Sequence, residues 1–121
     1  MGAIHAACLR SFVRNGHDVV LHSYSVSAGV PKGVRIFDAS KLMCESEIIP
    51  HKDTGSLAIA SDIYRIQREG LDLYVDCDVY CLKLFLYQEY TFARESDLQI
   101  NPVILKLPQD CKLLKKYFEV L

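Results

Sequence analysis

The chain has 121 residues, the size of one compact domain, so we expect a single domain over 1–121. Half of its residues are hydrophobic and 24% are charged, a globular composition that excludes a disordered chain. Its 14 basic and 15 acidic side chains leave a net charge of −1. That charge is too small to hold a phosphate backbone or an anionic membrane surface, so we expect no nucleic-acid partner.

The expected elements in the first half of the chain are local. A helix is predicted over 3–13, because Cys8, Leu9 and Phe12 recur on one face together with Ile4. The pair Asn15-Gly16 is a typical helix stop. Strands are predicted over 18–25 and 34–37, separated by a loop over 27–33, and the segment over 39–52 shows no clear period.

The second half continues the alternation of helices and strands. We expect a helix over 57–69, a strand over 71–79, two strands over 90–93 and 103–107, and a last helix from Asp110. The order α-β-β-α-β-β-β-α is typical of an α/β protein. Such a sheet normally opens with a strand, so this chain looks as if its first strand is missing. The sheet edge left unpaired would favour self-association.

The sequence shows no membrane span, because charged residues interrupt the most apolar region, Leu71–Tyr90. No signal peptide is predicted over Met1–Ala7, which lacks a basic segment. Five cysteines are an odd number without regular spacing, which favours reduced thiols and a cytoplasmic protein.

Two aspartates in the 71–79 strand attract most interest. If this segment is a strand, Asp76 and Asp78 share one face and Cys77 lies on the opposite, core-facing side. Two neighbouring carboxylates repel each other, and a divalent cation relieves that repulsion. Mg²⁺ and Mn²⁺ prefer such oxygen ligands and often share them with substrate phosphates. The alternative is a strand end with two solvated aspartates.

A second pair lies on the helix predicted over 57–69. Asp62 and Arg65 are three residues apart and face the same way, opposite the apolar stripe of that helix. An arginine there can bind sugar hydroxyls or phosphate oxygens in a forked geometry. The alternative is an ordinary surface ion pair.

These two segments carry a resemblance to a known family. The stretch Ala60-Ser61-Asp62-Ile63-Tyr64-Arg65, followed by Leu73 to Lys83 with its Asp76-Cys77-Asp78 motif, resembles the DXD-containing sugar-transferase region. Bacterial capsular-polysaccharide and lipopolysaccharide glycosyltransferases, yeast mannosyltransferases and large clostridial glucosylating toxins share that region. Upstream, Cys8 to Phe12, Asn15-Gly16-His17 and Pro31 to Val34 are similar to it as well, and in the family the strand after the "GH" turn points its tip at the nucleotide.

The resemblance implies a fold and an activity. It implies a partial GT-A-like, Rossmann-like mixed sheet flanked by helices, and a nucleotide sugar, above all a UDP-sugar, as the donor. It implies Mn²⁺ or Mg²⁺ held by Asp76 and Asp78, with Asp76 also contacting the donor and with Asp62 and Arg65 on the donor sugar. The sugar would pass to a glycan or another acceptor. No catalytic nucleophile is implied.

The sequence also departs from the family pattern. The first strand with its Ile-Trp motif and the C-terminal part with a further metal ligand are not found, so the chain resembles a truncated member. One alternative is therefore a non-catalytic remnant or binding module of the same family. Another is a phosphatase of the haloacid-dehalogenase type, which also carries a DxD motif after an apolar strand, although there the motif usually lies on the first strand.

Overall fold

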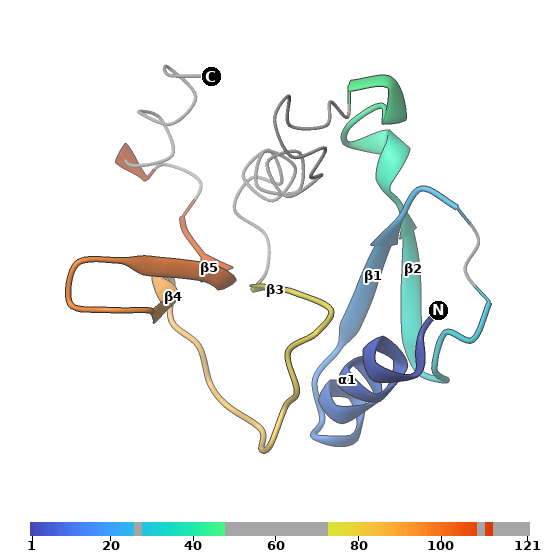
Figure 1. Ribbon diagram of the computed structural model, residues 1–121, viewed down its shortest axis with the longest axis horizontal. Coiled ribbons are helices and arrows are strands. Elements are labelled where there is room, and N and C mark those ends of the chain that lie inside the picture. The colour runs from blue at the N-terminus through green and yellow to red at the C-terminus, as the bar shows by residue number, and fades with distance from the viewer. Residues whose placement is uncertain (26–27, 48–72, 109–110, 113–121) are drawn as a thin grey trace. The chain divides into compact units, whose positions relative to one another are not determined.

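The computed structural model describes residues 1–25, 28–47, 73–108 and 111–112. The chain divides into two units, of which unit 1 comprises Met1–Glu47 and Asp76–Leu86, and unit 2 comprises Ile48–Val75 and Tyr87–Leu121 (Figure 1). Each unit is therefore built from two separate segments of chain. The described part is mixed α/β, as the sequence predicts.

Unit 1 begins with the helix α1 (Ala3–Arg14), which confirms the predicted helix. The helix ends where glycine permits a left-handed backbone, since Gly16 has φ 90° and donates its N–H to the carbonyl of Val13. Cys8, Leu9 and Phe12 are buried, as expected. Ile4 is not, because 72% of its surface is exposed, so the buried stripe excludes the first turn.

Two parallel strands follow in unit 1, β1 (Val19–Ser23) and β2 (Val34–Asp38), paired with Leu21 opposite Ile36. They confirm the two strands predicted here. Beyond β2, the segment without a clear period contains two short 3-10 turns, Ala39–Lys41 and Glu45–Glu47. Its remaining residues, 48–52, lie outside the described part of the chain.

Gly33 directly precedes β2, at a position that other residues would not fit easily. Its φ is 92°, and a Cβ atom built on it would lie 2.9 Å from Cγ1 of Val13 in α1. The glycine therefore allows both an uncommon backbone conformation and a close approach of the strand to the helix.

The described strands of unit 2 are antiparallel. They are β3 (Tyr74–Val75), β4 (Thr91–Arg94) and β5 (Ile100–Lys106), in the spatial order β3-β5-β4. A short loop over 95–99 joins β4 to β5, and the register shifts between Phe92 and Ala93. The strands predicted over 90–93 and 103–107 are confirmed. The five described strands thus form two sheets, a parallel pair in unit 1 and an antiparallel sheet in unit 2.

The strand predicted over 71–79 is wrong in its second half. Strand β3 ends at Val75, and the next residues form a turn in which Val79 donates its N–H to the carbonyl of Asp76 at 3.2 Å. We call the segment Asp76–Val79 the DXD turn. Aspartate side chains compete for local hydrogen bonds and favour turns over strands, which accounts for the difference.

The helix predicted over 57–69, the helix predicted from Asp110 and the start of the 71–79 segment lie outside the described residues, apart from isolated positions. None of the helices in the described part has the length and apolarity that a membrane span requires. All five cysteines lie within the described residues and are free thiols.

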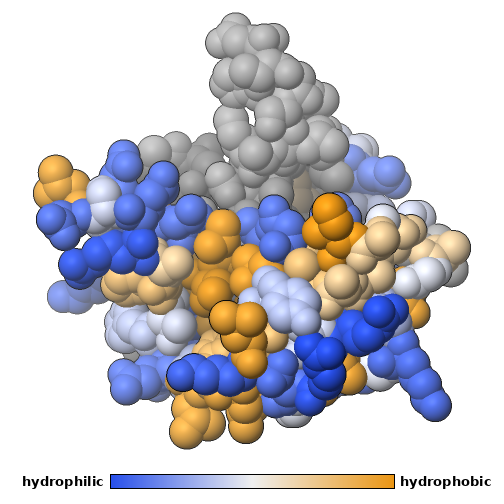
Figure 2. All heavy atoms as spheres, turned by 60° about the horizontal axis from the view of Figure 1, so that its bottom comes forward, coloured by the Kyte–Doolittle hydropathy of each residue, from blue (hydrophilic) through white to orange (hydrophobic). Residues whose placement is uncertain are grey.

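Burial differs between the units. The buried apolar residues in the described part of unit 1 are Cys8, Leu9, Phe12, Leu21, Pro31, Ala39, Met43 and Cys81, whereas unit 2 contributes Cys111. Large apolar side chains also reach the surface, as the orange residues among blue ones in Figure 2 show. Leu82 and Leu86 in unit 1 and Leu98 in unit 2 are the most exposed of them.

Candidate functional site

The DXD turn presents two carboxylates from one bend of the chain. Asp76 is half-buried and has an interaction partner, whereas Asp78 is exposed. Asp78 forms no hydrogen bond or ion pair with any residue in the described part of the chain. The carboxylate of Asp78 is therefore the more accessible of the two to a ligand from solvent.

The turn geometry replaces the predicted strand geometry. Because β3 stops at Val75, the strict alternation of faces does not extend to the aspartates. Cys77, predicted to face the core, is instead an exposed residue, and Val79 is half-buried. The prediction that Asp76 and Asp78 share one strand face is wrong, although both still lie on the same turn.

The negative charge of the turn acts on the cysteine between the aspartates. Partial burial of its sulfur raises the pKa of Cys77 above its ordinary value, although the residue as a whole reaches solvent. The carboxylates of Asp76 and Asp78 raise this pKa further, and Cys8 adds a smaller effect. The thiol therefore stays protonated at neutral pH and is a poor nucleophile there.

Helix α1 holds the chain immediately after the DXD turn. The hydroxyl of Ser11 accepts the backbone N–H of Cys81 at 2.8 Å and donates to the carbonyl of Cys8 at 2.5 Å. Asn15, at the end of α1, donates through Nδ2 to the carbonyl of Cys81 at 3.1 Å. Both backbone groups of Cys81 are thus bound by side chains of the helix.

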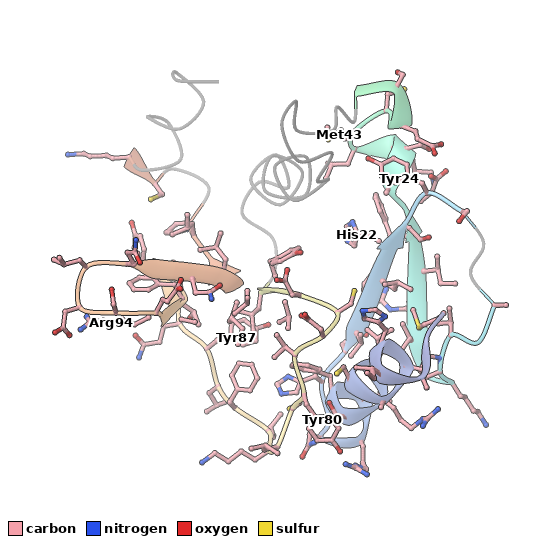
Figure 3. All side chains as sticks on the ribbon, viewed as in Figure 1. His22, Tyr24, Met43, Tyr80, Tyr87 and Arg94 are labelled. Atoms are coloured by element: carbon pink, nitrogen blue, oxygen red, sulfur yellow. The ribbon has the colours of Figure 1, made fainter. Side chains whose placement is uncertain are left out.

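A second contact to the helix lies beside this one. Arg14 donates from Nη2 to the hydroxyl of Tyr80 at 2.7 Å, and Figure 3 shows Tyr80 next to α1. Farther along, the ring of Phe85 lies 4.8 Å from that of His17 and 6.5 Å from that of Phe12. The segment that follows the turn is therefore fixed to the helix over several residues.

The carboxyl ends of β1 and β2 form a further polar edge in unit 1. The rings of His22 and Phe37 lie 4.7 Å apart there, and Figure 3 places His22, Tyr24 and Met43 at this end of β1. Asp38 at the end of β2 accepts the hydroxyl and the backbone N–H of Ser40. The carboxyl ends of parallel strands are common ligand sites in α/β proteins.

The predicted site residues fall into two groups. Asp76 and Asp78 lie together on the DXD turn, whereas Asp62 and Arg65 lie outside the described residues. Among the described residues, no three His, Cys, Asp or Glu side chains form a group able to hold a metal ion. A metal at the turn would therefore take two carboxylates from the described chain, and its other ligands would be water or substrate oxygens. The Mn²⁺ or Mg²⁺ cofactor stays a prediction.

Sequence reasoning did not single out Ser11, which is 1% exposed. The available signal was a serine on the apolar stripe of a helix, three residues after Cys8 and next to Phe12. Its partner, however, is 70 residues away in the sequence.

Comparison of the chain with known proteins does not identify a family. No protein-family model, no curated protein and no solved structure matches it.

Proposed function

We propose that the chain is a glycosyltransferase domain that binds a nucleotide sugar, above all a UDP-sugar, through a divalent metal ion on the DXD turn. The observation that carries this proposal is the turn itself. Asp78 is exposed and has no partner among the described residues, and the half-buried Asp76 lies two residues before it. Two adjacent carboxylates of this kind are the oxygen ligands that Mn²⁺ and Mg²⁺ prefer.

The two aspartates of the turn would have different roles in binding. Asp78 would hold the metal directly, because it is the more accessible of the two carboxylates. Asp76 would contact the metal and the donor. The bound metal supplies Lewis-acid stabilisation of the negative charge that develops on the departing diphosphate. Asp62 and Arg65 complete the proposal as contacts to the donor sugar, which would be transferred to a glycan or another acceptor.

The fold supports the proposal at a coarse level. A parallel strand pair covered by a helix occurs in unit 1, and the segment carrying the carboxylates belongs to the same unit. We propose that this unit is part of a GT-A-like domain. The free thiols and the absence of a membrane-spanning helix in the described residues are compatible with a cytoplasmic enzyme.

Calorimetric titration of the chain with UDP, with and without Mn²⁺, tests the proposal. We expect binding that depends on Mn²⁺ and that weakens at least about 100-fold in Asp78→Ala, because changes beside a metal's ligands alone typically cost about 10–100-fold. Asp97→Ala is the matched control, since Asp97 is an exposed aspartate in the loop between β4 and β5. Equal Mn²⁺–UDP affinity of Asp78→Ala and the wild-type chain would contradict the site.

Turnover separates the related functions. Release of UDP from a UDP-sugar with Mn²⁺ supports a transferase, whereas binding without release identifies a non-catalytic module of the same kind. Hydrolysis of a phosphate monoester, together with no release of UDP from UDP-sugars, would identify a phosphatase instead.

A further inference from the structure

Hydrogen bonds from side chains of α1 and its C-cap residue bind the chain just after the DXD turn. The turn is closed by its own hydrogen bond from Val79 to Asp76, but that bond does not fix the turn in the unit. The backbone is bound to the helix at Cys81, three residues after Asp78, where Ser11 and Asn15 contact it. We call these two hydrogen bonds the Cys81 contacts. The side-chain contact of Tyr80 with Arg14 lies beside them.

The Cys81 contacts are buried or partly buried, and each of the two side chains that form them makes a second hydrogen bond. Ser11 is 1% exposed and Cys81 is 4% exposed, so the bond between them is shielded from water. The Ser11 hydroxyl is used twice, because it donates to Cys8 and accepts from Cys81. Asn15 is also used twice, because its Nδ2 donates to the carbonyls of Ser11 and Cys81. Each group therefore has its orientation set by a second bond.

We propose that Ser11 and Asn15 are positioning residues that hold Asp76 and Asp78 in the geometry needed to bind the metal and the nucleotide. This inference rests on the proposed function of the DXD turn. Neither residue would touch the ligand, since each acts through the backbone of Cys81. A metal site tolerates little displacement of its ligands, so loosening the chain three residues from Asp78 weakens binding.

The substitution Ser11→Ala removes the acceptor of the Cys81 N–H and the hydroxyl donor to the carbonyl of Cys8, and it keeps the backbone hydrogen bonds of α1. Ser11→Thr keeps the hydroxyl, and a threonine hydroxyl in a helix can still donate to a carbonyl three or four residues back. Leu9→Ala is the matched control for general destabilisation. Leu9 is buried in the same helix at 8% exposure and makes no hydrogen bond to the chain after the DXD turn through its side chain.

Two measurements on the full chain test the inference. The first is amide hydrogen exchange at Cys81 and across the DXD turn, followed by NMR without any ligand. We expect exchange at Cys81 to become at least about 10-fold faster in Ser11→Ala, because the amide loses its buried acceptor. The second is calorimetric binding of UDP with Mn²⁺, under conditions where circular dichroism shows each variant folded. We expect at least about 10-fold weaker binding in Ser11→Ala, near-normal binding in Leu9→Ala and substantial recovery in Ser11→Thr.

The outcomes distinguish this inference from the proposed function. If the wild-type chain binds UDP with Mn²⁺ and Ser11→Ala binds equally well, the positioning role is wrong and the metal site stands. Unchanged exchange at Cys81 in Ser11→Ala also overturns it, as does an equal loss of affinity in Leu9→Ala. If the wild-type chain shows no Mn²⁺-dependent binding, the proposed function fails first, and a metal-positioning role fails with it. Hydrogen exchange then still reports whether Ser11 orders the turn.

Discussion

Different interactions stabilise the described part of unit 1 and the described part of unit 2. Unit 1 contains a helix that packs on a parallel strand pair, and its buried residues come from α1, β1, the loop before β2, the turns after β2 and Cys81. In unit 2, the strands β3, β4 and β5 pair along their backbones, and the side chain of Phe92 remains 44% exposed. The described part of unit 1 therefore combines strand pairing with buried side-chain packing, whereas that of unit 2 is held mainly by strand pairing.

The largest expected effect is a contrast between two phenylalanines. Phe12 is 8% exposed and has ring contacts to His17 and Phe85, whereas Phe92 is 44% exposed on β4. We expect Phe12→Ala to lower the free energy of unfolding by about 3–5 kcal/mol, and Phe92→Ala to lower it by about 1 kcal/mol or less. Urea unfolding followed by circular dichroism measures both. Equal losses would show that the contrast between the units does not hold.

A smaller effect is expected where β2 enters beside the helix. Gly33 and Gly29 both have positive φ angles, 92° and 79°, but only at Gly33 would a Cβ atom meet a close neighbour, Val13 at 2.9 Å. At Gly29 the nearest atom lies 3.8 Å away. We expect Gly33→Ala to cost about 1–3 kcal/mol in thermal or urea unfolding and Gly29→Ala to cost less, because it adds backbone strain without a clash. The reverse order would mean that helix and strand are loosely packed.

The smallest expected effect is on the pKa of Asp38, which lies on the surface of unit 1. Hydrogen bonds from the hydroxyl and then the N–H of Ser40 lower the pKa of Asp38 below its ordinary value of 3.8, against a small opposing effect of desolvation. Because the folded pKa lies below the unfolded one, this stabilisation is present above the unfolded pKa and is lost as pH falls through the folded pKa.

An NMR titration of the Asp38 carboxyl carbon measures this shift. We expect Ser40→Ala to raise the pKa of Asp38 toward 3.8, since the hydroxyl bond is the first cause of its lowering. An unchanged pKa in Ser40→Ala would show that the backbone N–H alone holds the carboxylate.

The elements predicted correctly are those with local signals. Helix α1 follows from the spacing of Cys8, Leu9 and Phe12, and its end at Arg14 follows from the Asn15-Gly16 stop, and none of these signals depends on distant parts of the chain. The segment over 71–79 looked like a strand because it is apolar. A strand also needs a partner, however, and among the described residues 73–79 the register supplies one only for Tyr74 and Val75, opposite β5.

The candidate site divides in the same manner. The pairing of Asp76 with Asp78 is visible in the sequence because the two residues are neighbours. The Cys81 contacts are not, because the donor and the acceptor are joined only by the fold. A polar residue on the apolar stripe of α1 indicates that Ser11 has a buried partner, but no local pattern identifies that partner as Cys81.

The interleaving of the two units has a consequence for how the protein is made. Cys81 leaves the ribosome 70 residues after Ser11, which at about 5–20 residues per second is a delay of roughly 4–14 s. During this time the nascent helix has neither its partner for the Ser11 hydroxyl nor the ring of Phe85 against Phe12. Unit 1 therefore reaches its final packing only after its second segment, Asp76–Leu86, has left the ribosome, and until then its apolar stripe is a target for chaperones and for aggregation.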